Sequence, residues 1–346
     1  MHQFWDKQPV PQEGCTYDGG KEIEKERVVV ETPHELPDGF TWCEPEIEEA
    51  YELINKYYVE DETFRLNYSL DTVKWVVEAP GYKNIGIRKS DTNELIGYIS
   101  SVPVTVSVEN KPIKMVQIDF LCVHPDHRTK RFAPMLISEV KRIANTNNIW
   151  QALYTAVTKI PTPITKSSYW HRFLNVKRLV KSGFYKTDRL REKFFELRGN
   201  SQFRKMKTKD IPKVTRILQN YFKDFKVAPV INKDWVKHWI LPINSYVNDE
   251  TDDFISFYDI SYDRVDGLDS VKQAYAFYMV GDVYNDAFLI TRNLGYDVFN
   301  TLDVGQETSK LEKLKFVKGT GHVYYYLFNW GLSEDPDLKD IQLKLP

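Results

Sequence analysis

Apolar residues recur at helical spacing in several segments of the chain. Between residues 47 and 58, Ile47, Ala50 and Ile54 fall on one side of a helical repeat. Residues 134–145 show the same pattern and begin with a proline, which the first turn tolerates because its N–H has no helical partner there. The pattern therefore predicts helices at residues 47–58, 73–77, 134–145, 211–222 and 284–294.

Runs rich in β-branched residues separate these helices and predict strands. The expected strands are residues 95–108, 114–123, 149–157, 254–260 and 273–280, with further strands towards the end of the chain. Between residues 114 and 157 a strand, a loop, a helix and a strand follow one another, which is typical of a mixed α/β core. The first forty residues are rich in proline and glycine and predict an extended arm.

The apolar pattern lapses at residues 199–208, and a new helix begins directly afterwards. We therefore expect two halves, residues 1–199 and 200–346. The segment 341–346 alternates apolar and polar residues, which predicts a half-buried strand whose position matters. An ordinary edge strand with a solvated end has the same pattern.

The composition is that of a globular protein. Of the 346 residues, 42% are apolar and 28% charged, and no apolar run approaches the roughly 20 residues that span a bilayer. No signal-peptide pattern is visible at the start, and Cys15, Cys43 and Cys122 lack paired spacing, so we expect reduced thiols and a cytoplasmic location. A net charge of -2 gives no general attraction to nucleic acid. We expect a monomer without a membrane span or a nucleic-acid partner.

The densest chemical signal is the stretch 119–134, which reads DFLCVHPDHRTKRFAP. A strand pattern leads there into a basic loop that opens a helix. Unpaired backbone N–H groups at a helix N-terminus attract anions, and Arg128, Lys130 and Arg131 add positive charge. The loop is therefore a candidate pyrophosphate site, although a solvated basic turn carries the same charges.

This stretch resembles the FLCVHxxxRSKRxAP motif of eukaryotic N-myristoyltransferases. Further similar segments occur in the same order: QFWDxQPV from residue 3, PxGFTW from 37, QALYTA from 151, YWHR from 169, DVFN from 297, LEKLKF from 311 and YYLFNW from 325. The spacing of Arg128, Arg131 and Ala133 also approximates the coenzyme A loop of the acetyltransferase superfamily, with Arg131 in place of a glycine. The resemblance implies an α/β (α+β) fold of two pseudo-symmetric GNAT-like halves, each a mixed, mostly antiparallel sheet flanked by helices.

The resemblance also implies an activity, the transfer of a myristoyl (tetradecanoyl) group from myristoyl-CoA to the N-terminal glycine amine of proteins, without a metal. In that family the amides matching Phe120 and Leu121 form the oxyanion hole, the hydroxyl matching Thr155 helps to orient the amine, and a C-terminal carboxylate, here that of Pro346, is the base. The residues implied to bind the thioester are Gln3, Phe4, Trp5, Phe120, Leu121, Cys122, Val123, Arg128, Thr129, Lys130, Arg131, Phe132, Ala133 and Pro134. Those implied to bind the peptide are Tyr58, Asp61, Tyr68, Asp119, Tyr154, Tyr169, His171, Phe184 and Ser256.

Three positions depart from the family pattern. Asp119 stands where the family usually has Asn, so an extra carboxylate lies near the amine site, to hold the amine as a cation or to share the role of base. Val157 replaces a glycine and narrows the space beside the peptide backbone. Thr320 stands where many members have the acidic residue of a Gly-Asp-Gly turn that pairs with a basic residue of the peptide.

Two other functions share some of these signals. A GNAT-like acetyltransferase acting on a lysine or a small amine would carry the same basic loop, but a single unit of that kind needs only about half of this chain. A non-catalytic acyl-CoA or lipid-binding relative would bind the thioester without turnover. His124 and His127 invite a zinc interpretation, but no third or fourth ligand has suitable spacing.

Peptide choice tests the departure at Thr320. Because threonine lacks a carboxylate, we expect peptides with and without a lysine opposite it to have similar kcat/KM values. Thr320→Asp should introduce a preference for lysine of at most about five-fold, the contribution of one exposed ion pair. If the ranking of the two peptides stays the same, this position does not contact the peptide.

Overall fold

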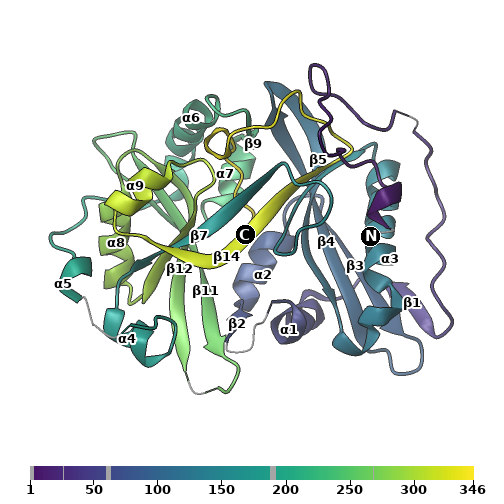
Figure 1. Cartoon of the computed structure of the whole chain (residues 1–346), viewed down its shortest axis with the longest axis horizontal. Helices are drawn as coiled ribbons and strands as arrows, with labels where there is room; N and C mark the ends of the chain where they lie inside the picture. Colours follow the sequence, from purple (N-terminus) through teal and green to yellow (C-terminus); the bar gives the residue numbers. More distant parts are fainter. Residues whose placement is uncertain (1–3, 26, 60–63, 188–191, 268) are drawn as a thin grey trace.

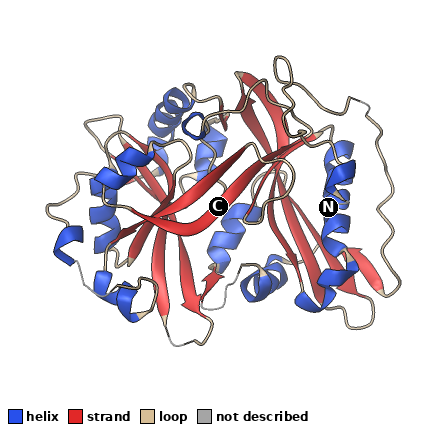
Figure 2. Ribbon diagram, in the orientation of Figure 1, coloured by secondary structure: helices blue, strands red, loops and turns tan. Residues whose placement is uncertain are grey.

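A continuous sheet runs through the molecule, and helices pack around it (Figures 1 and 2). The computed structural model describes residues 4–25, 27–59, 64–187, 192–267 and 269–346. Its strands are β1 (Phe40–Cys43), β2 (Phe64–Asn67), β3 (Lys83–Lys89), β4 (Leu95–Val108), β5 (Lys111–Val123), β6 (Gln151–Ala156), β7 (Thr165–Phe173), β8 (Arg204–Lys205), β9 (Val227–Pro229), β10 (Asn244–Val247), β11 (Phe254–Arg264), β12 (Ser270–Val280), β13 (Val298–Leu302) and β14 (Val317–Phe328). Its α-helices are α1 (Ile47–Tyr57), α2 (Leu70–Val77), α3 (Phe132–Thr146), α4 (Val176–Lys181), α5 (Glu192–Phe195), α6 (Ile211–Phe222), α7 (Lys233–Trp239), α8 (Tyr284–Asn293) and α9 (Thr308–Lys313). Its 3-10 helices are η1 (Trp5–Lys7), η2 (Pro125–Lys130), η3 (Thr208–Asp210) and η4 (Leu338–Asp340).

Most elements expected from the apolar pattern are confirmed. The five predicted helices correspond to α1, α2, α3, α6 and α8, and the five predicted strands to β4, β5, β6, β11 and β12. Helix α3 begins at Phe132, two residues before the predicted start, because Pro134 is accommodated in the first turn. The predicted strand at residues 341–346 is wrong. Within this segment only Ile341 forms a bridge, with Val227, and three consecutive residues, 341–343, are buried, whereas a half-buried strand would bury every second one.

The two parts of the chain repeat one topology. In the first, β4 and β5 are antiparallel, α3 follows, and β6 then lies parallel to β5. In the second, β11 and β12 are antiparallel, α8 follows, and β13 then lies parallel to β12. These are the two parallel pairs of the described sheet, and its other strand pairs are antiparallel. The expected fold class, two similar halves with mostly antiparallel sheets flanked by helices, is confirmed.

The next strand of each half crosses to the other half. Strand β7, which follows β6, pairs with β13, and β14, which follows β13, pairs with β6. The two crossing strands also pair with each other, so the sheet is continuous through its centre. Figure 1 shows β7 and β14 running side by side across the middle of the molecule. Because of this exchange, the sheet of each half includes a strand from the other half. The division of the chain at residues 199–200 stays a prediction.

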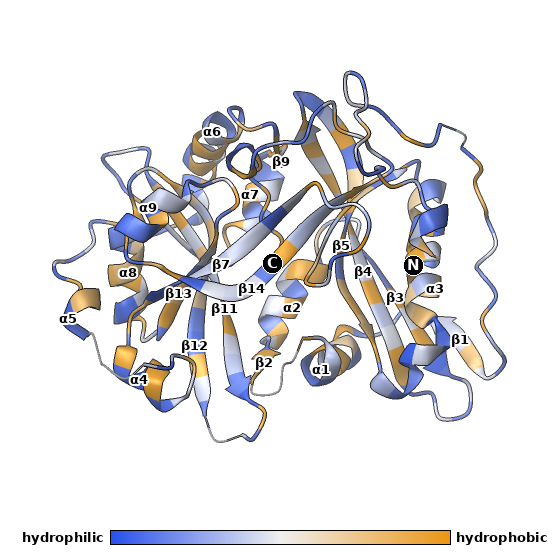
Figure 3. Cartoon of the chain, viewed as in Figure 1, coloured by the Kyte–Doolittle hydropathy of each residue, from blue (hydrophilic) through white to orange (hydrophobic). Residues whose placement is uncertain are grey.

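Apolar packing also joins the halves. One buried cluster combines residues of α1 and α2 from the first half with residues of α6, β11 and β12 from the second, including Trp75, Val214 and Phe277. Separate clusters lie under α3, around Leu136, and under α8, around Phe288. Figure 3 shows apolar positions along β4 and on α2 at the centre of the molecule. None of the helices within the described ranges is long and apolar enough to cross a membrane.

A buried carboxylate fastens the crossing strand to the second half. Asp303 follows β13 directly and is 4% exposed. It accepts hydrogen bonds from the Ser167 hydroxyl at 2.7 Å, the Ser168 backbone N–H at 2.8 Å and the Trp170 indole N–H at 3.1 Å. All three donors lie on β7. The carboxylate therefore fixes β7 at the point where it enters the sheet of the other half.

Removal of this carboxylate tests its importance for the joined sheet. Asp303→Ala leaves buried donors on β7 without an acceptor, so we expect the free energy of unfolding to fall by about 3 kcal/mol. Asp335→Ala, at an exposed position of the same residue type, should change it by less than about 0.5 kcal/mol. Denaturant unfolding measures both. Equal effects of the two substitutions would contradict a structural role for Asp303.

Candidate active site

Strands β5 and β6 separate within the sheet. Their ladder consists of Met115, Val116 and Gln117 opposite Gln151, Ala152 and Leu153, yet both strands continue beyond it. If the parallel register is continued by two residues, Asp119 on β5 comes opposite Thr155 on β6. Both side chains are then on the same face of the sheet as those of Gln117 and Leu153. The separation opens a gap between two strands that remain in the sheet through their other neighbours, β4 and β14.

A β-bulge shapes the β5 side of this gap. On β4, Tyr98 pairs with Cys122 and Ser100 with Asp119, so Phe120 and Leu121 lie opposite the single residue Ile99. Phe120 has a φ of 52°, in the left-handed region that a non-glycine residue rarely adopts. A bulge removes its extra residue from the regular ladder, so the local amide groups are free for other acceptors. Burial raises the pKa of Tyr58, whose ring packs on that of Phe120, above its usual range.

A cavity of about 980 Å³ lies against this bulge. Most of its lining is apolar and comes from β5, α3 and β6, with Val116, Ile137 and Val140 as examples. Its polar lining includes Asp119 and Thr155, and Pro346 also contributes. The cavity is therefore suited to a long apolar chain whose reactive end lies beside polar groups.

Asp119 is the acidic side chain among the described residues that line this cavity. It is 7% exposed, and the Gln117 side-chain amide donates a hydrogen bond to its Oδ2 at 2.8 Å. Burial raises the pKa of its carboxyl to about 7, and the hydrogen bond from Gln117 opposes this rise. The site thus contains a carboxyl group that exchanges its proton near neutral pH.

The tail of the chain passes through the interior to reach the same place. Hydrogen bonds hold successive residues of the tail. The backbone N–H of Gln342 donates to the Val227 carbonyl at 2.8 Å, and the Tyr325 hydroxyl donates to the Leu343 carbonyl at 3.1 Å. The Lys344 backbone N–H lies 3.4 Å from the Tyr278 hydroxyl. These anchors come from β9, β14 and β12, so the last residues have a fixed position.

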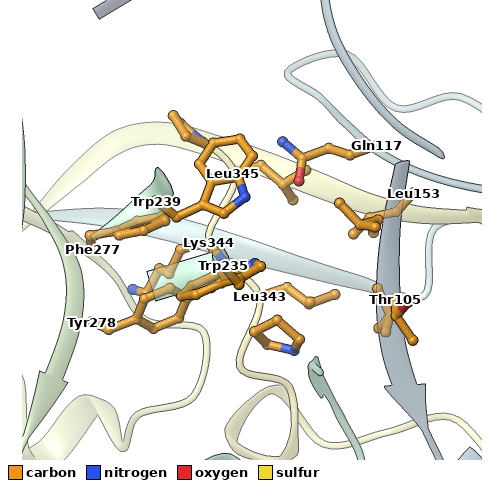
Figure 4. Close-up of a pocket in the computed structure, with 14 residues that line it drawn as sticks. Thr105, Gln117, Leu153, Trp235, Trp239, Phe277, Tyr278, Leu343, Lys344 and Leu345 are labelled. Atoms are coloured by element: carbon orange, nitrogen blue, oxygen red, sulfur yellow. The ribbon is translucent and has the colours of Figure 1, made fainter. Parts of the chain in front are cut away.

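A second cavity, of about 430 Å³, lies on the other side of the tail. Figure 4 shows Gln117 and Leu153 on one side of it, Phe277 and Tyr278 on the other, and the tail residues between them. Pro346 lines both cavities. The tail therefore ends at the gap between β5 and β6, beside the cavity that Asp119 and Thr155 line.

The basic loop lies between β5 and α3. Arg131 has φ 61° and ψ 28°, the left-handed conformation for which the corresponding loop of acetyltransferases has a glycine. The side chain of Arg128 is held by the ends of two neighbouring elements, since it donates to the carbonyls of Val123 in β5 at 3.2 Å and of Tyr57 in α1 at 3.1 Å. Thr129, Lys130 and Arg131 are exposed. The loop therefore presents backbone amides and positive charge at the start of α3.

The other residues expected to bind the thioester differ in what they can offer. Phe132 is fully buried, and Cys122 is buried with its thiol 3.7 Å from the Leu53 carbonyl, so only their backbones can meet a ligand. Burial raises the pKa of the Cys122 thiol to about 12. Trp5 lines the large cavity and stacks on Tyr154 at 5.8 Å between ring centroids, and Phe4 packs against Trp5. Gln3 lies outside the described residues.

The residues expected to bind a peptide fall mainly into two neighbouring groups. Tyr58 and Tyr68 both contact the ring of Phe120. His171 packs on Phe184 at 5.5 Å, and its Nδ1 shares a hydrogen bond with Asn300 at 2.7 Å. Burial lowers the pKa of His171, which favours the neutral ring.

Tyr169 connects these two groups. It precedes His171 on the same face of β7, and its hydroxyl is close enough to affect the pKa values of both Tyr58 and Tyr68. Ser256 stands apart, since it is fully buried and its hydroxyl bonds to the backbone of Tyr278. Asp61 lies outside the described residues.

The residues that support the site were not among those predicted from the sequence. Gln117 lies two positions before Asp119, so the strand periodicity alone places both side chains on one face. Tyr221, Tyr278 and Tyr325 anchor the tail from distant parts of the chain, and no local pattern distinguishes them from core tyrosines. Among the residues that the structure describes, no group of three or more His, Cys, Asp or Glu side chains could hold a metal ion.

Fold and site together define an acyltransferase architecture. An apolar cavity lies where two neighbouring strands separate, and one of these two strands carries a bulge. The chain matches the family model described as "Myristoyl-CoA:protein N-myristoyltransferase, N-terminal domain" over residues 21–167 and the model of the C-terminal domain over residues 185–342. The chain thus belongs to the N-myristoyltransferase family, whose members are acyltransferases.

Similar proteins agree with this assignment. Glycylpeptide N-tetradecanoyltransferase 1 of Arabidopsis thaliana is 38% identical over 96% of this chain and 86% of its own length. Glycylpeptide N-tetradecanoyltransferase 2 of Danio rerio is 38% identical over 95% of this chain and 74% of its own length. The crystal structure of Saccharomyces cerevisiae N-myristoyltransferase with bound myristoyl-CoA superposes with a TM-score of 0.90 at 28% identity, covering 100% of this chain and 99% of that one.

Two substitutions at Arg131 separate its charge from its backbone conformation. Arg131→Ala and Arg131→Gly both remove the charge, so each should weaken binding of a coenzyme A thioester by about five-fold and make the remaining binding less sensitive to salt. Only glycine relieves the left-handed backbone, so the Gly variant should be more stable than the Ala variant by about 1 kcal/mol. Calorimetric titration and denaturant unfolding measure the two effects. Unchanged affinity in both variants would exclude Arg131 from the phosphate site.

Proposed function

We propose that this chain transfers a tetradecanoyl group from tetradecanoyl-coenzyme A to the N-terminal glycine amine of proteins. The observation that carries the proposal is the meeting of three features in one gap: the apolar cavity of about 980 Å³, the bulge at Phe120 and Leu121, and the anchored tail that ends at Pro346. The names of the similar proteins support the same reaction.

The apolar cavity suits the acyl chain. Each methylene that leaves water contributes about 0.8 kcal/mol, which corresponds to about a four-fold change in affinity. A cavity lined by β5, α3 and β6 therefore favours a long acyl chain over an acetyl group. The exposed basic loop before α3 is suited to the phosphates of the coenzyme A end.

The bulge suits the oxyanion. Attack on a thioester carbonyl gives a tetrahedral intermediate with a negative oxygen, which preorganised N–H groups stabilise. The amides of Phe120 and Leu121 lie where the ladder with β4 is interrupted.

The amine needs a proton acceptor, because an α-amino group has a pKa of about 7.7–8.0 and is mostly protonated at neutral pH. We assign this role to the α-carboxylate of Pro346, which borders the acyl cavity. The tail has little freedom to move, since hydrogen bonds from Tyr325 and to Val227 hold its backbone. Thr155 lines the same cavity and would orient the amine, and the tyrosines around Tyr169 would border the rest of the peptide.

Changes at Pro346 test the proposed base. Extension of the chain beyond Pro346 converts its carboxylate into a neutral amide, and removal of Leu345 and Pro346 withdraws the charge by about 7 Å at about 3.3 Å per residue. Both variants should bind the thioester normally but transfer the acyl group about 10²–10⁴ times more slowly, with part of the rate restored at higher pH.

The same extension added before Met1 is the control and should leave the rate unchanged. The assay uses a radiolabelled tetradecanoyl thioester with a peptide that begins with glycine and a matched peptide that begins with alanine. Full activity of the C-terminally extended protein at neutral pH would exclude Pro346 as the base. Thioester binding without transfer to either peptide by the unmodified protein would refute the proposed function itself.

A further inference from the structure

In the proposed reaction two protons leave the amine nitrogen, and one carboxylate cannot hold both at once. An α-ammonium group carries three protons and the product amide nitrogen carries one, so two protons leave the nitrogen in each turnover. The first leaves before attack, because only the neutral amine has a lone pair. The second leaves after the N–C bond has formed and the nitrogen has become positively charged. The coenzyme A thiolate takes up one proton, since a thiol with a pKa of about 8.5 is protonated at neutral pH.

We propose that Asp119 is a second proton-transfer group of this site, which accepts the second proton of the nitrogen and passes it to the leaving thiolate. The proposal rests on the proposed function, in which Pro346 accepts the first proton. It assigns to the two carboxylates separate steps of one reaction.

The position of Asp119 in the strand supports this role. It directly precedes Phe120 and Leu121, whose amides face the carbonyl oxygen in the proposed reaction, so it is next to the reacting carbon. The parallel register continues from Gln117 and Leu153 to Asp119 and Thr155, so its side chain is on the same face as the hydroxyl that would orient the amine. Asp119 and Thr155 line one cavity, together with Pro346.

The surroundings of Asp119 hold its carboxyl in place. Its side chain is 7% exposed, and the Gln117 amide donates to Oδ2 at 2.8 Å. The Ser100 hydroxyl donates to its backbone carbonyl at 3.0 Å, which fixes the backbone just before the bulge. Gln117 itself lines the second cavity, and Pro346 lines both that cavity and the one that Asp119 lines. A buried carboxyl with one fixed donor is suited to exchange its proton with a bound substrate rather than with bulk water.

Atoms and electrons balance in this step. The nitrogen lone pair forms the N–C bond, and the carbonyl π electrons move to the oxygen held by the bulge amides. The cationic nitrogen then gives its proton to Asp119. When the oxygen electrons return, the C–S bond breaks and its electron pair leaves on sulfur, which takes the proton from Asp119. The products are the amide and free coenzyme A thiol, and Asp119 returns to its carboxylate form.

The acidity of Asp119 fits both halves of this step. Burial raises its pKa to about 7, so the acid and base forms are both populated at neutral pH. The titratable groups that line the same cavity are Tyr58, Tyr154, Lys141 of α3 and the tail carboxylate of Pro346, and Tyr98 of β4 also lies close enough for Asp119 to affect its pKa. Burial raises the pKa values of these tyrosines above their usual range, so they stay neutral, and Lys141 lies 3.5 Å from Glu24. Within the described lining of the cavity, Asp119 is therefore the side chain that changes charge near pH 7.

The first test removes the charge and keeps the shape. Asp119→Asn retains an oxygen that can accept from Gln117, so we expect unchanged binding of the tetradecanoyl thioester. The kcat for a glycine peptide should fall by about 10²-fold at neutral pH, the effect of losing one proton-transfer group. The rise of kcat near pH 7 should disappear from its pH profile. Asp335→Asn, the same change at an exposed position, should alter neither quantity.

The second test changes the acidity of Asp119 without replacing it. The hydrogen bond from Gln117 lowers the pKa of Asp119, so Gln117→Met should raise this pKa and shift the rise of kcat to higher pH. The same peptide is used throughout, so its own amine contributes no shift. In the double variant, which carries both Gln117→Met and Asp119→Asn, the rise of kcat near pH 7 should be absent, so Gln117→Met should not shift the pH profile. A purely structural effect of Gln117→Met would not depend on Asp119 in this way.

Three outcomes would overturn the inference while leaving the proposed function intact. One is a rate and pH profile for Asp119→Asn equal to those of the unmodified protein. Another is loss of thioester binding in that variant, which would mean that Asp119 shapes the cavity. The third is an unshifted profile for Gln117→Met in a folded protein. By contrast, absence of transfer by the unmodified protein would refute the proposed function and this inference together.

Discussion

The site depends on the point at which β5 and β6 stop pairing. Two parallel strands hydrogen-bond from Met115 to Gln117 and then separate, although each stays in the sheet through its other neighbour. Backbone groups that leave a ladder must find other partners or remain available to a ligand. The bulge at Phe120 and Leu121 occurs beyond this point, and the apolar cavity occupies the space that the separation opens. One interruption of a sheet is thus accompanied by both a cavity and a bulge that borders it.

The strand exchange explains how the end of the chain reaches this gap. Because β14 pairs with β6, the second half of the chain is bound to the first at the edge of the separation. The tail returns from β14 through the interior, where Tyr221 and Tyr325 of the second half hold it by hydrogen bonds and Met115 and Leu153 of the first half belong to the same apolar cluster. The carboxylate Asp303 stabilises the same arrangement by fixing β7 against β13. The contacts that stabilise the joined sheet therefore also help to determine where the tail lies.

Burial gives the polar groups of the site their character. A carboxyl such as Asp119 is costly to ionise when it is removed from water, and the single hydrogen bond from Gln117 compensates only in part. The same physical effect lowers the pKa of Lys344 to about 8 and keeps the surrounding tyrosines neutral. Charge changes near neutral pH are consequently concentrated on few groups, which suits a reaction that has to move protons.

The sequence alone determined the elements and the chemistry of the basic loop, because both are encoded within short segments. Helix α6 and strand β4 follow directly from the spacing of apolar residues, and the positions of Phe120, Leu121 and Arg131 follow from one continuous motif. Only the tertiary structure decided the path of the tail, whose alternation predicts a strand, whereas Ile341 to Leu343 are enclosed on both sides. It also decided the exchange of β7 and β14 and the position of Pro346 in the cavity that Asp119 lines. These contacts join residues far apart in the chain, and their free energy depends on burial and on partners that no local pattern contains.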